Sequence, residues 1–134
     1  MMDKTEKQTE TTIMDLGDVA SKLGDAIVAA AEYQAFNAAE QHYQNDSQAR
    51  ELLGQFQEEQ RTVRLMQQLR TATAEDAQRL EDLQKNVEAN ETLAAYFDAQ
   101  EKLVALLREL NEFISGQLNM DFAELTKPRR GCCG

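Results

Sequence analysis

The most reactive side chains of the sequence stand together in the stretch TKPRRGCCG at 126–134. Cys132 and Cys133 are the only two cysteines in 134 residues. Adjacent thiolates can bind a soft metal, supply part of an iron–sulfur site or close a strained disulfide. The positive charges of Lys127, Arg129 and Arg130 precede the pair and favour the thiolate forms. The stretch does not have the spacing of a prenylation box, in which Cys stands fourth from the end.

Two thiolates do not complete a metal site, because zinc and iron–sulfur centres normally take four protein ligands. We therefore predict that Cys132 and Cys133 form half of a site whose other ligands come from a second subunit or another protein. Gly131 and Gly134 would let the backbone approach such a ligand closely. Two alternatives stay open, namely a disordered tail with two incidental thiols and a thiol or metal protein that acts alone.

The remaining sequence offers no recognisable catalytic set. His42 is the single histidine, and no candidate nucleophile lies near it in the sequence. There is no glycine-rich phosphate loop, and a di-iron bundle would need Glu and His on several helices. We predict that the protein is not an enzyme and that His42 is a surface residue near a helix end.

Composition favours an all-α protein of one domain. Hydrophobic residues make up 42% of the chain, which has only six glycines and one proline, fewer turn residues than a strand-rich protein needs. The net charge of −10 would repel phosphate backbones, so we expect no direct nucleic-acid binding. The longest apolar run, AIVAAA at 26–31, is too short to span a bilayer. We expect a cytoplasmic protein without membrane insertion.

The pattern divides the chain into three parts. Residues 1–14 are polar and aperiodic, which predicts a disordered leader. Residues 15–120 carry helical periodicity, and residues 121–134 read as a flexible basic tail that contains the cysteines. From Leu16 the apolar residues recur at steps of three and four as far as Tyr43, although periodicity does not decide whether a bend interrupts this helix.

Three joints separate the helices of the central part. Asp46 or Ser47 can cap a second helix, because each offers a short oxygen acceptor to free backbone amides. Thr73 and Asp76 have the spacing of a capping box and predict the start of a third helix. Asn90 ends that helix or caps the next one.

The last helix, roughly 91–120, has the strongest pattern. A heptad seam with 4-3-4-3 spacing comprises Tyr96, Gln100, Leu103, Leu107, Leu110, Ile114 and Gln117. A second apolar face comprises Leu93, Phe97, Val104, Leu106 and Phe113. A helix that is apolar on two faces must be covered on two sides. We predict an antiparallel helical bundle or hairpin with long coiled-coil-like helices that self-associates. The predicted subunit interface comprises Tyr96, Leu103, Leu107, Leu110 and Ile114.

Three stretches together resemble the YlbF/YmcA family of small bacterial helical proteins. They read LxxAIxxAxEYQAFxxAEQxYQND, ARELLGQFQEEQ and ANETLAAYFDAQEKLVALLRELNEFIS, and the correspondence covers about residues 18–118. The matching residues are those expected to pack helices together or to join one helix to the next. The resemblance therefore depends on many positions taken together and not on a single motif. The chain departs from the family at Ala31, where Ser is common, and in having its two cysteines adjacent.

The resemblance implies an all-helical, often self-associating fold without enzyme activity. Family members act with a partner called YaaT in a complex that regulates the endoribonuclease RNase Y. Through this complex they affect mRNA processing, competence, sporulation and biofilm formation. The complex is associated with iron–sulfur clusters, so Cys132 and Cys133 are the candidate ligands of a [4Fe-4S] cluster shared with partner chains. The alternative is a structural homo-oligomer with an incidental tail.

Overall fold

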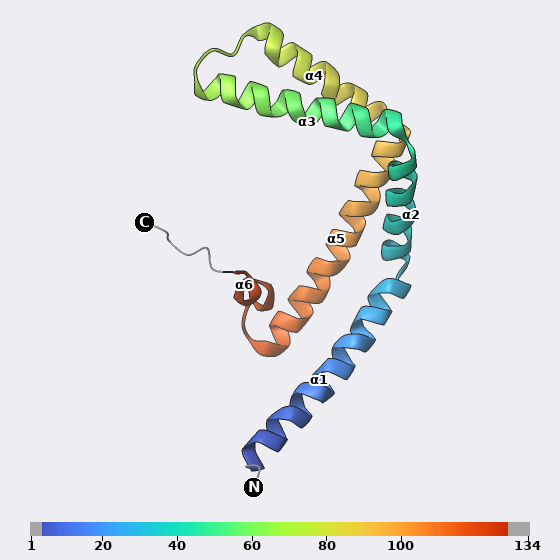
Figure 1. The fold of residues 1–134 in the computed structure, drawn as a ribbon, viewed down its shortest axis with the longest axis vertical. Coiled ribbons are helices and arrows are strands. Elements are labelled where there is room, and N and C mark those ends of the chain that lie inside the picture. Colours follow the sequence, from blue (N-terminus) through green and yellow to red (C-terminus); the bar gives the residue numbers. More distant parts are fainter. Residues whose placement is uncertain (1–3, 129–134) are drawn as a thin grey trace.

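The computed structural model describes residues 4–128. The described part consists of helices and their joints, which confirms the predicted all-α class (Figure 1). The helices are α1 (Lys4–Ala29), α2 (Ala31–Asn45), α3 (Ser47–Gln68), α4 (Ala74–Ala89), α5 (Glu91–Leu118) and α6 (Phe122–Thr126).

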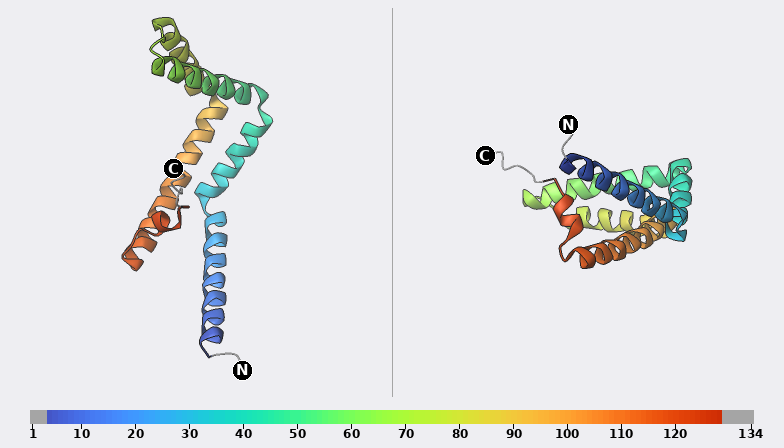
Figure 2. Two further views of the ribbon diagram at one scale, coloured as in Figure 1. Left: turned by 60° about the vertical axis from the view of Figure 1, so that its left-hand side comes forward. Right: turned by 90° about the horizontal axis from the view of Figure 1, so that it is seen from below.

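The helices form two antiparallel pairs that meet at a corner. α3 and α4 pack together as one arm, and α2 and α5 pack together as the other. α1 continues beyond α2, and α6 folds against α5. Within the described residues α1 packs only on α2 and has no packing contact with α5, and the two views of Figure 2 show these helices apart. The part of the molecule that the structure describes is therefore open, and its long helices lack a neighbouring helix on one side.

Side-chain caps fix the joints that the sequence predicts. Asp46 Oδ1 accepts a hydrogen bond of 3.0 Å from the amide of Ala49 and so caps α3, and Asn90 caps α5 in the same way. Such caps satisfy backbone amides that a helix start leaves free. Asp46 Oδ2 also accepts a bond of 2.7 Å from the Thr92 hydroxyl, which ties the joint between α2 and α3 to the start of α5.

The capping box of α4 is also present. The Thr73 amide donates to Asp76 Oδ2 at 2.9 Å, and the Asp76 amide donates to the Thr73 hydroxyl oxygen at 3.3 Å. Arg79 pairs with Asp76 on the same helix and with Glu59 on α3 at 3.2 Å. The box therefore fixes the start of α4 and positions a cation that links the two helices of the arm.

These hydrogen bonds predict that the fold loses stability in acid. The backbone amide of Thr73, its hydroxyl and Arg79 hold the pKa of Asp76 below its usual value. The backbone amide of Ala49 and the Thr92 hydroxyl likewise lower the pKa of Asp46. Because both values are lower in the folded state, the stabilisation is complete above the unfolded pKa of about 4 and is lost as pH falls through the folded values.

We expect the urea midpoint to fall between about pH 5 and pH 2, at fixed protein concentration. An Asp46→Asn/Asp76→Asn double variant should be less stable at neutral pH and should lose less over this range, since it lacks both carboxylates. Glu88→Gln, a change on the exposed face of α4, is the matched control and should follow the wild type. If the urea midpoint of the double variant falls in acid as much as that of the wild type, the acid sensitivity does not come from Asp46 and Asp76.

The first helix begins earlier than the sequence predicts and ends at a break in the backbone. The sequence predicts a disordered leader over 1–14, but α1 begins at Lys4. Its first turns are rich in Lys, Glu and Gln, which favour helix, and the Thr12 hydroxyl donates to the Gln8 carbonyl at 2.8 Å. The helix stops at Ala29, because Ala30 adopts an extended backbone with φ −68° and ψ 144°. This break answers the question that periodicity left open.

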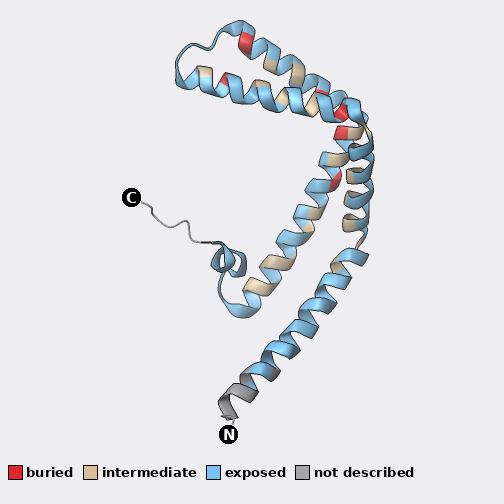
Figure 3. Ribbon diagram, viewed as in Figure 1, coloured by how far each residue is buried: buried red, intermediate tan, exposed pale blue. Residues whose placement is uncertain are grey.

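The core is small and lies at the corner between the two arms. Ala49, Val87 and Leu93 are buried there, and partly buried side chains surround them, namely Tyr43, Leu52, Leu53 and Phe56. Figure 3 shows few buried positions elsewhere along the helices. Leu93 has no exposed surface and is the largest of the fully buried side chains. The corner therefore holds the fold together, and the outer ends of the helices contribute little to its core.

The exposed surface is much larger than that of a compact monomer. The chain exposes 11204 Å², whereas a compact protein of 15.1 kDa exposes about 7,100 Å². The nine terminal residues outside 4–128 can account for at most roughly 1,500 Å² of the difference, even if they are fully extended. Most of the excess surface therefore belongs to the described helices.

Candidate protein-interaction site

An aromatic cluster fixes the inner half of α5 against α2. The Tyr96 ring stacks on Tyr43 with centroids 5.1 Å apart and lies 5.7 Å from Phe36 and 5.6 Å from Phe97. Such pairs add specific geometry to the area that they bury. Tyr96, which the sequence places in a subunit interface, is thus engaged by its own chain.

Beyond this cluster α5 extends past its neighbour. α2 has 15 residues and α5 has 28, so they are about 22 Å and 42 Å long. The other four predicted interface residues lie on the outer half of α5, where Leu103, Leu110 and Ile114 are half-buried and Leu107 is 41% exposed. These four side chains follow Tyr96 along α5, beyond the aromatic cluster that packs Tyr96 against α2.

The phase of the seam differs from the heptad prediction. Gln100 and Gln117 are exposed, whereas Ala99 is buried and Leu106 is half-buried on the inward side. A straight α-helix has 3.6 residues per turn and drifts away from a 3.5-residue seam. Within the described residues, α5 has no partner helix along its whole length that would hold it to the heptad repeat.

The outer half of α5 also has an exposed apolar flank. Val104 is 38% exposed, Leu107 is 41% exposed and Phe113 is 69% exposed. Nearby, the side-chain oxygen of Asn111 is buried and has no hydrogen-bond donor among the described residues. The outer half of α5 therefore has both an inward apolar side and an exposed one, as the sequence predicts.

α1 carries a matching apolar stripe. Leu16 and Val19 are each 63% exposed, Leu23 is 38% exposed and Ile27 is half-buried. The sequence places these residues on one apolar helical face, and helical periodicity cannot tell burial within a chain from burial against a partner. We call this stripe and the outer half of α5 (residues 103–118) the open face. Apolar patches of this kind mark interaction sites.

The α3–α4 arm has a separate exposed apolar pair. Leu65 is 56% exposed and Leu69 is 65% exposed, near the end of α3. They lie on a different arm from the open face, so they provide controls for substitutions made there.

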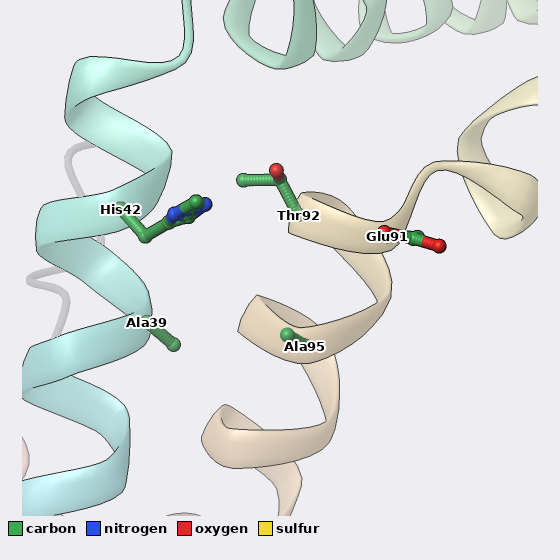
Figure 4. A pocket seen from close by; sticks show the side chains of 5 residues that line it. All are labelled: Ala39, His42, Glu91, Thr92 and Ala95. Carbon is green, nitrogen blue, oxygen red and sulfur yellow. The ribbon is translucent and has the colours of Figure 1, made fainter.

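His42 faces a small crevice between α2 and α5 (Figure 4). The crevice has a volume of about 140 Å³ and is lined by Ala39, His42, Glu91, Thr92 and Ala95. The His42 and Thr92 side chains point toward each other, whereas Glu91 points away. Within residues 4–128 no group of three or more His, Cys, Asp or Glu side chains is arranged to hold a metal ion. The crevice is therefore lined by a single imidazole.

Two other predictions concern the cysteine pair and membrane insertion. Cys132 and Cys133 lie outside the described residues, so their role as cluster ligands stays a prediction. In the described part of the chain, no helix has the length and apolar character needed to cross a bilayer.

Comparisons with known proteins agree with this architecture. The family model described as control of competence regulator ComK, YlbF/YmcA, matches residues 16–119. UPF0342 proteins of Streptococcus pyogenes serotypes M49 and M4 are each 30% identical over 105 residues, which cover 78% of this chain and 93% of each relative. The fold is similar to the crystal structure of Bacillus subtilis RicA in complex with RicF, with a TM-score of 0.66 and 16% identity. That match covers 85% of this chain and 98% of the other.

Proposed function

Because the chain belongs to the YlbF/YmcA family, we propose that it is a non-catalytic adaptor that works through protein–protein contacts in a cytoplasmic regulatory complex. The open face is the observation that carries this proposal. It presents apolar side chains from two helices that do not contact each other within the described chain. A monomer gains nothing from keeping such a surface in water, whereas an assembly gains about 25 cal/mol for each Å² that it buries.

The complex that we propose regulates RNase Y-dependent mRNA processing, with a YaaT-like protein and other chains of this family as partners. Family membership supports this assignment, and so does the crystal structure of a similarly folded protein in complex with another protein. The acidic charge of the chain suits a role in which RNA is handled by a partner, because the net charge of −10 repels phosphate backbones.

The test compares RNA ends in the native cell. Deletion of the gene should change the processing of the same transcripts that RNase Y depletion changes, measured by sequencing 5′ ends. Leu107→Glu should fail to restore processing, since it places a charge on the open face. The matched variant Leu65→Glu, on the α3–α4 arm, should restore it. Processing that is unaltered in the deletion strain contradicts the proposed function.

The cysteines provide a second, separable part of the proposal. We propose that Cys132 and Cys133 supply two of the ligands of a [4Fe-4S] cluster shared with partner chains. Anaerobic co-purification with a YaaT-like partner should give a brown complex, and Cys132→Ser/Cys133→Ser should lower its iron content. Leu65→Glu, which leaves both thiols in place and lies on the α3–α4 arm, is the control. Equal iron in the wild-type and serine complexes means that the cluster ligands lie elsewhere.

A further inference from the structure

We propose that the free end of the α3–α4 arm is a second protein-docking surface, which takes an acidic amphipathic helix of another protein. The surface comprises Arg61, Arg64, Leu65, Leu69 and Arg70, and we call it the arm face. Figure 1 shows that the arm projects away from the corner, with the turn between α3 and α4 at its free end. The inference goes beyond the proposed function, because the arm face lies on a different arm from the open face and would bind an additional partner.

The arm face lies on the side of α3 that points away from α4. Val63 is 3% exposed and Met66 is half-buried, so these two residues mark the side of α3 that packs on α4. At about 100° per residue, Arg61 and Leu65 fall on the opposite side of the helix. Every residue of the arm face is exposed, so a partner can reach it in the described structure.

Two leucines form the apolar centre of the arm face. Leu65 is 56% exposed and Leu69 is 65% exposed, and they stand four residues apart, which separates them by one helical turn of about 6 Å. Side chains at this spacing form a ridge that packs into the groove between side chains of another helix. The spacing therefore suits a helical partner with its own apolar stripe.

The charge around this centre is positive, although the chain is acidic. Residues 60–74 contain three arginines and no Asp or Glu, a net charge of +3 in a chain of net charge −10. Arg61 lies one turn before Leu65, and Arg70 follows Leu69 directly. The apolar centre thus has a guanidinium at each end, which selects a partner with carboxylates at both ends of its apolar stripe.

The three arginines of the arm face have no ion-pair partner among the side chains that the structure describes. Arg79, on the same arm, pairs with Glu59 and Asp76, and the other ion pairs of the described chain use lysines. Like charges on one face repel one another, and a partner that supplies carboxylates relieves this repulsion. The arm therefore uses one arginine for its own packing and leaves three available to a partner.

Arg70 occupies a backbone position that favours glycine. Its φ is 57°, and it follows Leu69 at the end of α3, where glycine is the usual residue. The amide of Thr71 donates to the Met66 carbonyl at 2.8 Å, which fixes this turn. A long cationic side chain stands where a glycine would suit the backbone better. This observation supports a role for the guanidinium outside the folding of the arm.

A protein helix suits the arm face better than RNA. Arginines alone bind phosphates, but the net charge of −10 repels a phosphate backbone, and the arm face has no aromatic side chain on which a base could stack. Contact with Leu65 and Leu69 removes apolar surface from water only if the partner is apolar between its charges. These properties favour an acidic amphipathic helix.

Fluorescence anisotropy with designed helical peptides tests the chemistry of the arm face. One peptide carries two leucines one turn apart, flanked at both ends by Glu, and its control has Gln in place of each Glu. We expect the full-length chain to bind the Glu peptide at least about tenfold more tightly than the Gln peptide at low salt. No binding of the Glu peptide, or equal binding of the two, overturns the proposal.

Variants locate the binding. Arg61→Glu/Arg64→Glu and Leu65→Glu should each weaken binding of the Glu peptide at least about tenfold, because they reverse the charge or place a charge in the apolar centre. Leu107→Glu, on the open face, is the matched control and should bind as the wild type does. Binding that survives both arm-face changes, or that is lost in the control, overturns the proposal.

Arg70→Gly separates docking from folding. Since glycine adopts φ 57° freely, the urea midpoint of this variant should be no lower than that of the wild type. Its affinity for the Glu peptide should nevertheless fall about threefold or more, because one guanidinium is lost. Unchanged affinity overturns the assignment of Arg70 to the arm face.

Photo-crosslinking in the native cell identifies the occupant. A benzophenone amino acid replaces Gln68, which is exposed one turn after Leu65, and Gln84, which is exposed on α4, is the control position. We expect a crosslink from position 68 alone, to an acidic amphipathic segment of another protein. No crosslink, a crosslink to RNA, or a crosslink only to another copy of this chain overturns the proposal.

These measurements are independent of the RNA-processing test. Leu65→Glu changes the arm face and leaves the open face intact, so it should lose the Glu peptide and still restore processing. The arm-face proposal and the proposed function can therefore fail separately.

Discussion

Leu93→Ala is expected to lower the free energy of unfolding by about 3–5 kcal/mol, the upper range for truncation of a leucine in a packed core. Leu93 is fully buried and packs with Ala49 and Val87 at the corner where the two arms meet. Few side chains among residues 4–128 are buried, so little of the described core lies elsewhere to compensate for a cavity at this position. A loss of this size is a large part of the total stability of a small protein.

Urea denaturation followed by circular dichroism measures this effect. The protein concentration must be the same for each variant, because unfolding coupled to association depends on concentration. Leu65→Ala is the matched control, since Leu65 is 56% exposed and should change stability by less than about 0.5 kcal/mol. Equal losses for the two variants would show that Leu93 is not the centre of the core.

Tyr96→Ala should cost on the order of 2–4 kcal/mol. The ring lies within 6 Å of three other aromatic rings, and it joins α2 to α5 where those helices share their main contact. The expected loss is below that for a fully buried aromatic residue, because Tyr96 is only half-buried.

Tyr96→Phe separates ring packing from the hydroxyl group. The contacts of Tyr96 with Phe36, Tyr43 and Phe97 are made by its ring, so the Phe variant should stay within about 0.5 kcal/mol of the wild type. The same urea titration measures both variants. A large loss in Tyr96→Phe would mean that the hydroxyl has a structural partner and that ring stacking does not explain the effect.

Local chemistry explains which parts of the fold could be predicted. The joints at Asp46, Thr73 and Asn90 were predicted from side chains that accept hydrogen bonds from the first free amides of a helix. These bonds involve residues at most three positions apart, so the sequence contains both partners. The extension of α1 back to Lys4 was missed, because residues 1–14 lack the apolar period by which the other helices were found.

The candidate site was predicted only in part. Periodicity identified the apolar side chains of the open face, including Leu103, Leu107 and Leu110, but it could not assign their partners. Tyr96 belongs to the same predicted seam and yet packs against α2 of its own chain. The difference arises because the shorter α2 packs along α5 only near the aromatic cluster. The length of α2 and its position beside α5 cannot be inferred from the α5 sequence alone.

The sequence by itself determined that the protein is helical, where most of its joints lie and which side chains are apolar, because these properties depend on neighbours along the chain. Only the tertiary structure decided that the helix breaks at Ala30, that α1 stands apart from α5 and that the core is confined to the corner. The physical reason is that burial depends on which helices meet in space. The same leucine pattern is satisfied by a helix of its own chain or by a helix of another.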